Sequence, residues 1–526
     1  MKKDKRIMGG SLIPLTMLGI IMTACSLDIE ESDSFFTKGE SAIFNGVENP
    51  SAQLTTIYNN IKSEAESQDN LYALTEVTTD ELVVPTRGTD WGDNGVWRTL
   101  HVHTYGSTHS QILNVWNAKN SAVLRCTEII DPKTTTETPL ELAEAKFARA
   151  YNMWIVMDFW GQQPFRNPAD GPDVLPSVMS RSESYDMIVQ DLTDAIANLP
   201  TGSSNSSDKN RPVKSTARFL LAKVKLNAAV YKGTYGANDL QDVINLVNDI
   251  EADGYSLVGN YFEIFHGPTF TNTDVIWSVA AGAGNRMWDG LHYNQVHPDN
   301  TGGGWNGFST LAEFYDKFEG PSTSNSVGLG QEERRGYTQT LASTNGTNYG
   351  FGFGFQLGQM YGFKDGAAVA LTNRTGQPLV FTKDFPGLVG NTEVTGMRLL
   401  KYSPVNGGFT SGVVMARFGD AHLMRAEAML RLGQIAPALV EVNELRALRT
   451  NTPPLATLSE AVMLDERGRE LYTEGWRRND MIRFGKYNAP KEFMPSAEGG
   501  DDHTNLFPIP SSALLTNPNL VQNPGY

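Results

Sequence analysis

The chain has 526 residues, a formal net charge of -16 and two cysteines, Cys25 and Cys126. A strongly acidic surface repels nucleic acid and anionic lipid headgroups, so nucleic acid is excluded as a partner. About 500 residues can bury a large core or form two to three lobes. After the N-terminal segment the sequence has no apolar run long enough to predict a membrane-spanning helix.

The N-terminus has the pattern of a bacterial lipoprotein signal. A positively charged segment, residues 2–6, precedes a run of apolar and small residues, 7–24, that stops at Cys25. We predict that residues 1–24 are a signal peptide and that Cys25 is the lipidated first residue of the mature chain. An ordinary secretory signal with a chance cysteine is the alternative. Removal of this segment takes away four positive charges and one negative charge, which changes the net charge to about -19.

Residues 25–40 are polar and acidic, which predicts a flexible tether. From there, helical periodicity dominates residues 41–254, which we expect to form an N-terminal helical scaffold. The longest helix, at 139–159, opens with a capping threonine, Thr138, and a first-turn proline. Cys126 lies in a helical pattern and is expected to be a small buried apolar residue. The other predicted helices span about 50–66, 107–130, 181–199, 214–231 and 239–252.

Composition changes in the second half of the chain. Residues 255–410 are rich in Gly, Asn, Thr and aromatic residues, which predicts loops, short strands and few helices. Residues 411–526 return to helical patterns. Within them, residues 420–449 read as a helical hairpin in which Gly433 ends the first helix, as in a tetratricopeptide unit.

Tryptophans in polar, Gly-rich surroundings are the candidate binding residues. An indole face packs against the C–H face of a pyranose, and neighbouring carboxylates, amides and guanidinium groups can bond the hydroxyls. The candidates lie in residues 87–106 and 284–308, and burial of these rings in a loop core is the alternative. They are Asp90, Trp91, Asn94, Trp97, Arg98, Arg286, Trp288, Asp289, Tyr293 and Trp305.

Other clusters of reactive residues have simpler explanations. The charged residues between Glu466 and Arg483 could supply paired carboxylates for glycoside hydrolysis, but their spacing favours ion pairs between helices. His101, His103 and His109 lack the flanking acidic residues of a metal site, and "GFGFGFQLG" lacks the context of a dinucleotide site. We therefore expect no catalytic residues, no metal and no cofactor.

Three segments together resemble the SusD/RagB family of outer-surface glycan-binding lipoproteins of Bacteroidetes. They are "AEAKFARAYNMWIVMDFWGQQPF" (143–165), "MRAEAMLRLGQ" with the following helices through residue 486, and the terminus "LFPIPSSALLTNPNLVQNPGY" (506–526). The acidic residues after Cys25 also resemble the signal that exports such lipoproteins to the outer face of the cell.

This resemblance implies a mostly α fold: a tetratricopeptide-like scaffold of helix pairs with a large, irregular, loop-rich region that carries short strands. It also implies a cell-surface lipoprotein of the outer membrane that captures oligo- or polysaccharide for a SusC-like TonB-dependent transporter. The aromatic candidates and the acidic charge favour a neutral β-glucan such as laminarin. A polyuronate such as alginate, a peptide ligand and a glycoside hydrolase remain the alternatives.

Overall fold

The computed structural model describes residues 44–526 apart from 172, 207–208, 266–270, 280–283, 325, 405–411 and 496–501. The predicted signal peptide (1–24), the lipidation site Cys25 and the tether (25–40) lie outside the described residues. Among the described residues, no helix has both the length and the apolar character needed to cross a bilayer.

Most regular structure is helical, and the helices predicted from periodicity are confirmed. The predicted helix at 214–231 is divided at Asn227 into two shorter ones. The helices are α1 (Pro50–Glu66), α2 (Leu71–Glu76), α3 (Val96–His101), α4 (Ser110–Ile130), α5 (Pro139–Trp160), α6 (Arg181–Asn198), α7 (Lys214–Leu226), α8 (Ala228–Lys232), α9 (Asp239–Ala252), α10 (Asn285–Trp288), α11 (Ala312–Tyr315), α12 (Phe418–Arg431), α13 (Ile435–Ala447), α14 (Glu460–Leu471), α15 (Arg477–Arg483) and α16 (Ser511–Thr516).

Local signals explain why the long helices begin and end where they do. The side chains of Thr138 and Glu141 form a reciprocal capping box at the start of α5, and Pro139 occupies the first turn. Gly161, with φ of 69°, ends α5 in the left-handed conformation that a side chain disfavours. Gly433, two residues after the end of α12, has φ of 77°, which confirms the predicted end of that helix.

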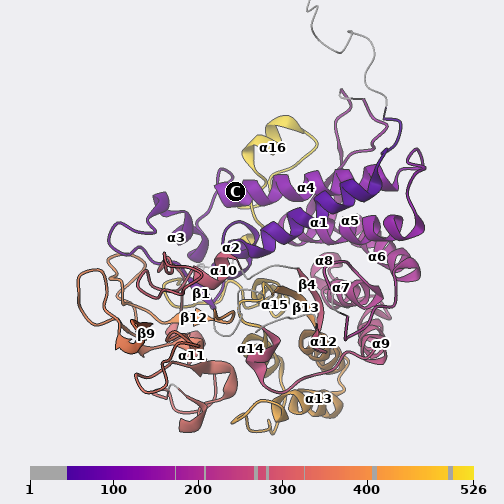
Figure 1. The fold of residues 1–526 in the computed structure, drawn as a ribbon. Coiled ribbons are helices and arrows are strands. Elements are labelled where there is room, and N and C mark those ends of the chain that lie inside the picture. The colour runs from indigo at the N-terminus through magenta and orange to yellow at the C-terminus, as the bar shows by residue number, and fades with distance from the viewer. Residues whose placement is uncertain are drawn as a thin grey trace, which may run out of the picture. The chain divides into compact units, whose positions relative to one another are not determined.

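The helices pack as a continuous array, and its members come from two parts of the chain that a long irregular segment separates (Figure 1). Helices α4, α5, α6, α7 and α9 pack each on the next, and α9 packs on α12, which pairs with α13. The long irregular segment is therefore an insertion between α9 and α12. The fold is the predicted one: a mostly α scaffold of tetratricopeptide-like helix pairs with a loop-rich region.

Most of the short antiparallel strands that the structure describes lie in the insertion, and three lie earlier in the chain, at 82–83, 162–165 and 177–180. Strand β4 pairs with β13 near the two ends of the insertion, and the register shifts at Val414 and Ala416. The pairings are β1 with β5, β2 with β3, β9 with β10, β8 with β11, and β12 with β7 and β6. The strands are β1 (Leu82–Val83), β2 (Gln162–Phe165), β3 (Ser177–Ser180), β4 (Val275–Val279), β5 (Ser309–Thr310), β6 (Gly336–Tyr337), β7 (Phe353–Gln356), β8 (Gly358–Gln359), β9 (Tyr361–Lys364), β10 (Ala367–Ala370), β11 (Val380–Phe381), β12 (Arg398–Leu400) and β13 (Val413–Arg417).

One main hydrophobic cluster joins the three predicted segments. Residues 44–526 form one compact unit, and Phe147, Phe308 and Phe418 from the three segments are buried in the same cluster. Cys126 is completely buried, as predicted, and burial raises the pKa of its thiol to about 12. The insertion therefore packs firmly on the scaffold.

The charged residues of α14 and α15 are buried ion pairs, as their spacing indicated. Glu466 accepts hydrogen bonds from Arg334 at 2.8 Å and from Arg446 at 2.5 Å, and all three side chains are inaccessible to solvent. Asp480 bonds Arg467 at 2.8 Å and Arg483 at 2.6 Å in the same way. Carboxylates enclosed by guanidinium groups cannot serve as an open acid–base pair, so this cluster is structural.

We expect stability to fall in acid as these carboxylates take up protons. Burial favours protonation of Glu466, but the surrounding guanidinium groups, Arg334 foremost, prevail and lower the pKa from 4.5 to about 2. Because the folded-state pKa lies below the unfolded value, Glu466 contributes its full stabilisation above pH 4.5 and loses it as the pH falls towards 2. The loss amounts to about 3 kcal/mol.

Urea unfolding at pH 6, 3.8 and 2.5 tests this expectation. Burial raises the pKa of Asp289 and Glu81, so their effect on the free energy of unfolding changes only above their unfolded pKa values of 3.8 and 4.5. Below pH 3.8 the change comes from Glu466 and the other carboxylates whose pKa is lowered. A free energy of unfolding that stays constant between pH 3.8 and 2.5 would contradict the assignment.

Candidate functional site

Trp91 lies in a loop whose backbone is held in an unusual conformation. The loop follows β1, and Arg87 and Asp90 exchange backbone hydrogen bonds of 3.0 and 2.9 Å at its start. Trp91 has φ of 59°, and Asp93 and Asn94 also have positive φ. A bulky residue adopts this region only where its surroundings determine the conformation, and such positions cluster at binding sites.

The indole of Trp91 is fixed from three sides while part of it stays exposed. Its Nε1–H donates to the carbonyl of Trp305 at 2.8 Å. Its ring packs edge-to-face on Phe308 at 5.9 Å, and lies 5.7 Å from the ring of Trp97. A Cβ on Gly307 would lie 2.4 Å from the indole, so the ring rests directly on the backbone of that glycine. The exposed part of the ring is therefore presented in one orientation.

Replacement of Gly307 by alanine tests this contact. The added methyl would overlap the indole of Trp91, and we expect the free energy of unfolding to fall by about 1–3 kcal/mol. Gly302→Ala in the same loop is the matched control, because its Cβ would meet only Asn300 at 3.5 Å. Urea unfolding of the two variants should separate them, and equal stability would show that the indole moves freely away.

Polar groups converge beside the exposed indole. The hydroxyl of Tyr293 donates to Asp90 Oδ2 at 2.9 Å, and the Arg374 guanidinium donates to the same oxygen at 2.5 Å. Arg374 also stacks on the Tyr293 ring at 4.2 Å and forms an ion pair with Glu393. His292 Nε2 lies 3.0 Å from Glu393 Oε2. About half of the Arg374 side chain is exposed, at 49%, so its guanidinium is available to a ligand.

The electrostatics of this cluster keep Glu393 ionised and Tyr293 neutral. Burial favours the neutral form of Glu393, but hydrogen bonds from Arg374 and His292 prevail and lower its pKa. Burial, with the hydrogen bond to Asp90, raises the pKa of Tyr293 to about 12. The cluster therefore offers a neutral phenol, a cation and two carboxylates next to an aromatic surface.

The structure brings together part of the predicted set. Asp90, Trp91, Tyr293 and Trp305 are partly exposed and linked by the contacts above; with Arg374 and Glu393 they form what we call the Trp91 site. Asn94 is exposed in the turn after Trp91. Arg98 is partly exposed and donates to Thr86 Oγ1 at 2.6 Å, which holds it beneath the same loop.

The remaining predicted residues do not belong to the Trp91 site. Trp97, Trp288 and Asp289 are only 4%, 7% and 4% exposed, so their predicted role as a ligand surface is wrong. Trp97 lies on the inward face of the short helix α3, and the short helix α10 buries Trp288 against Phe351. Arg286 stacks on Tyr72 at 4.1 Å and donates to the carbonyls of Ala65 and Thr473, at a separate cavity.

Arg374 and Glu393 are site residues that the sequence did not reveal. They lie in irregular chain more than 280 residues after Asp90, and Arg374 is in the turn of residues 373–376. Nothing in the sequence around Arg374 indicates that its side chain contacts Asp90, which lies so far away in the chain. Only the pairing of distant loops places them beside the indole.

Among the described residues, no group of three His, Cys, Asp or Glu side chains close enough to hold a metal ion lies at the Trp91 site. His101 and His103 bond the separate carbonyls of Glu492 and Thr78, at 2.8 and 2.7 Å. His422, Glu441 and Glu444 lie close enough to hold an ion. However, Arg425 donates to Glu441 at 2.8 Å, which already compensates that carboxylate.

Comparison with known proteins links both halves of the chain to one group. The family profile described as "SusD family" matches residues 273–526, and the one described as "Starch-binding associating with outer membrane" matches residues 34–226. Among curated proteins, Starch-binding protein SusD of Bacteroides thetaiotaomicron is 25% identical over 440 residues, which cover 75% of this chain and 74% of that relative.

Solved structures share the fold. A SusD-like protein from Bacteroides fragilis aligns with a TM-score of 0.68 and 20% identity over 93% of this chain and 98% of its own. Surface glycan-binding protein A from Bacteroides thetaiotaomicron, in complex with laminarihexaose, aligns with a TM-score of 0.64 and 17% identity over 90% of this chain and 99% of its own.

Proposed function

The chain belongs to the SusD family, and from this premise we propose that it is a cell-surface glycan-binding protein that carries out no chemistry on its ligand. The observation that carries the proposal is the fixed, partly exposed indole of Trp91 with hydrogen-bonding groups on one side. Stacking on half of an indole, roughly 100 Å² of apolar surface, contributes about 2.5 kcal/mol. Asp90, Tyr293 and Arg374 would then bond the sugar hydroxyls.

A neutral β-glucan such as laminarin is the ligand we favour. Two of the proteins compared above bind glucans: the curated relative is a starch-binding protein, and the structural neighbour was solved in complex with laminarihexaose. The site itself carries two carboxylates, Asp90 and Glu393, against one guanidinium, Arg374. A polyuronate would have to overcome that balance, so alginate-like ligands are the second candidate, with peptide capture by the same fold as the third.

Delivery to a SusC-like TonB-dependent transporter is the proposed purpose of binding. Family membership and the description of the N-terminal profile support an outer-membrane location, with the lipid anchor at Cys25 and the body on the outer face. In that role the protein should release its ligand readily. Modest affinity, in the micromolar to millimolar range, is consistent with stacking on few rings after the costs of association.

Affinity electrophoresis tests the ligand class directly. The protein should be retarded in gels that contain laminarin and not in gels that contain alginate, and it should release no reducing sugar from either. Leu515→Ala, which truncates an exposed side chain on α16, should be retarded like the unmodified protein. Binding of peptides with no retardation by any glycan would favour the hypothesis of peptide capture. Release of reducing sugar would favour the hypothesis of a glycoside hydrolase.

A further inference from the structure

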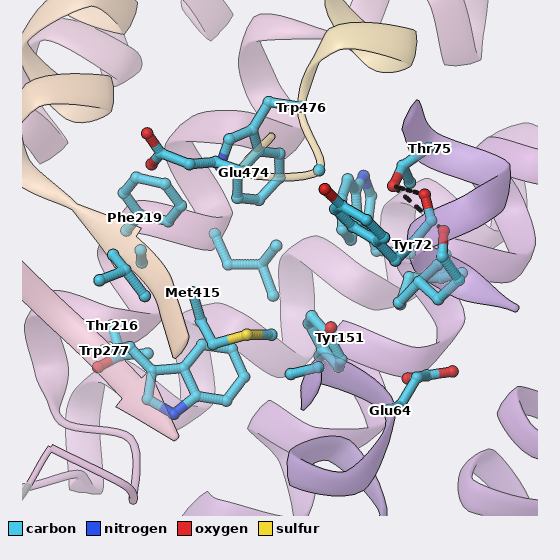
Figure 2. Close-up of a pocket in the computed structure, with 18 of the residues that line it drawn as sticks. Glu64, Tyr72, Thr75, Tyr151, Thr216, Phe219, Trp277, Met415, Glu474 and Trp476 are labelled. Carbon is cyan, nitrogen blue, oxygen red and sulfur yellow. Dashed lines mark hydrogen bonds between the residues drawn. The ribbon is translucent and has the colours of Figure 1, made fainter. Parts of the chain in front are cut away.

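A cavity whose lining does not include Trp91 lies in the helical scaffold. It has a volume of about 90 Å³ and is lined by residues of α1, α2, α5, α7, α10, β4 and β13 and by residues 474–476 (Figure 2). That volume would hold about six water molecules, which is room for a single ring and excludes a glycan chain. Any occupant must therefore be small.

The walls of the cavity are aromatic rings locked against one another. Trp277 packs edge-to-face on Phe147 and on Tyr151, each at 5.5 Å. Trp476 lies 5.8 Å from Trp154 and 5.8 Å from Phe219. Because these contacts fix the rings, the cavity does not collapse when it is empty.

Two of the indoles direct their polar atoms elsewhere. Trp277 Nε1 donates to the carbonyl of Asn210 at 3.2 Å, and Trp154 Nε1 donates to the hydroxyl of Tyr231 at 3.0 Å. These rings therefore offer only carbon surface to the cavity. Such a lining favours an apolar body, since burial of apolar surface is the main source of affinity in a dry site.

Two tyrosine hydroxyls of the lining are free to bond a ligand. In the part of the chain that the structure describes, the hydroxyls of Tyr72 and Tyr151 have no hydrogen-bond partner. Figure 2 shows both tyrosines on one side of the cavity, across from Phe219 and Trp277. Burial raises the pKa of both phenols, so both remain protonated donors at neutral pH. A buried tyrosine hydroxyl normally has a partner, and a ligand oxygen would supply it.

The charged groups that line the cavity leave one cation without an ion pair among the described residues. Glu64 forms an ion pair with Lys119, and Glu474 lies between Lys401 at 2.6 Å and Arg417 at 2.7 Å. Arg286 also lines the cavity, and no described carboxylate lies within ion-pair distance of its guanidinium. The buried carboxyl groups of Glu76 and Asp289 also feel this guanidinium, but burial raises the pKa of both towards the neutral form, so Arg286 is the cation of the lining without an ion-pair partner in the described chain.

We propose that this cavity binds a small carboxylate that carries one apolar or aromatic ring. The ring would fill the space between the indoles, and the carboxylate would accept hydrogen bonds from Tyr72 and Tyr151 in the field of Arg286. This site is separate from the Trp91 site and goes beyond glycan binding. It takes a different class of ligand, which the charge and the size of the cavity determine.

Methyl NMR of the mature protein tests the proposal with benzoate as the probe. Met415 lines the cavity, so its ¹³C-labelled methyl signal, assigned with Met415→Leu, reports occupancy through the ring current of the ligand. We expect benzoate to shift this signal and to bind about tenfold more tightly than benzyl alcohol, which has the same ring without the charge.

The paired variant Tyr72→Phe/Tyr151→Phe keeps both rings and removes both hydroxyls. It should lower the affinity for benzoate about tenfold and change that for benzyl alcohol less than about twofold. Tyr361→Phe on β9 is the matched control and should change neither. Laminarin retardation of all three proteins shows separately whether the Trp91 site works.

Three results would overturn the proposal: no shift of the Met415 signal at 10 mM benzoate (about the weakest binding of interest), equal affinity for the acid and the alcohol, or unchanged benzoate affinity in the paired variant. Unfolding curves for each variant verify that it is folded.

Discussion

Trp91→Ala is expected to weaken laminarin binding about 60-fold. The variant removes the stacking surface, worth about 2.5 kcal/mol, and each 1.4 kcal/mol corresponds to a factor of ten in the dissociation constant. Isothermal titration calorimetry or affinity electrophoresis with laminarin measures the effect. The ring touches Trp97 and Phe308, so thermal unfolding must show that the variant remains folded.

Trp91→Phe separates stacking from the hydrogen bond that orients the ring. Phenylalanine retains an aromatic face and loses the Nε1–H that donates to Trp305. We expect an intermediate loss of roughly three- to tenfold, since one neutral hydrogen bond contributes about 1 kcal/mol. An alanine variant that binds laminarin within twofold of the unmodified protein would remove Trp91 from the site.

Glu470→Gln is expected to lower the free energy of unfolding by about 3–5 kcal/mol, because it leaves buried cations without compensation. Glu470 accepts hydrogen bonds from Arg449 at 2.8 Å, Arg417 at 3.0 Å and Arg334 at 3.1 Å, and all four side chains are buried. Burial favours the neutral acid, but these guanidinium groups, Arg449 foremost, hold its pKa well below the usual value. An amide supplies neither the charge nor the second acceptor.

Glu460→Gln on the same helix is the matched control. Its side chain is 61% exposed and lies 3.9 Å from Arg431, so the change should cost less than about 0.5 kcal/mol. Urea unfolding of both variants at pH 7 gives the comparison. If Glu470→Gln is no less stable than Glu460→Gln, the buried network does not stabilise the fold.

The helical scaffold was predictable because its signals are local. A capping residue such as Thr138, a left-handed glycine such as Gly433 and an apolar face repeat within a few residues of the helix that they define. The ion pairs of α14 and α15 were likewise visible as opposite charges three and four residues apart. What the sequence did not reveal is that these pairs extend to Arg334 and Arg417 in the insertion.

Exposure of the candidate tryptophans was predictable only in part. Trp91 and Trp305 lie in Gly-rich loops and remain partly exposed, whereas Trp97 and Trp288 lie in similar composition and are buried. Helices α3 and α10 have six and four residues, which is too short for periodicity to show which face turns inward.

The sequence by itself determined the scaffold helices and the buried state of Cys126, and it predicted that two Gly-rich loops, 87–106 and 284–308, carry the site. Only the tertiary structure decided which rings face solvent, which distant charges join them, and that a cavity stands open between α5, α7 and β13. The reason is physical: a helix depends on contacts between near neighbours in the chain, whereas the exposure of a side chain depends on which remote segments cover it.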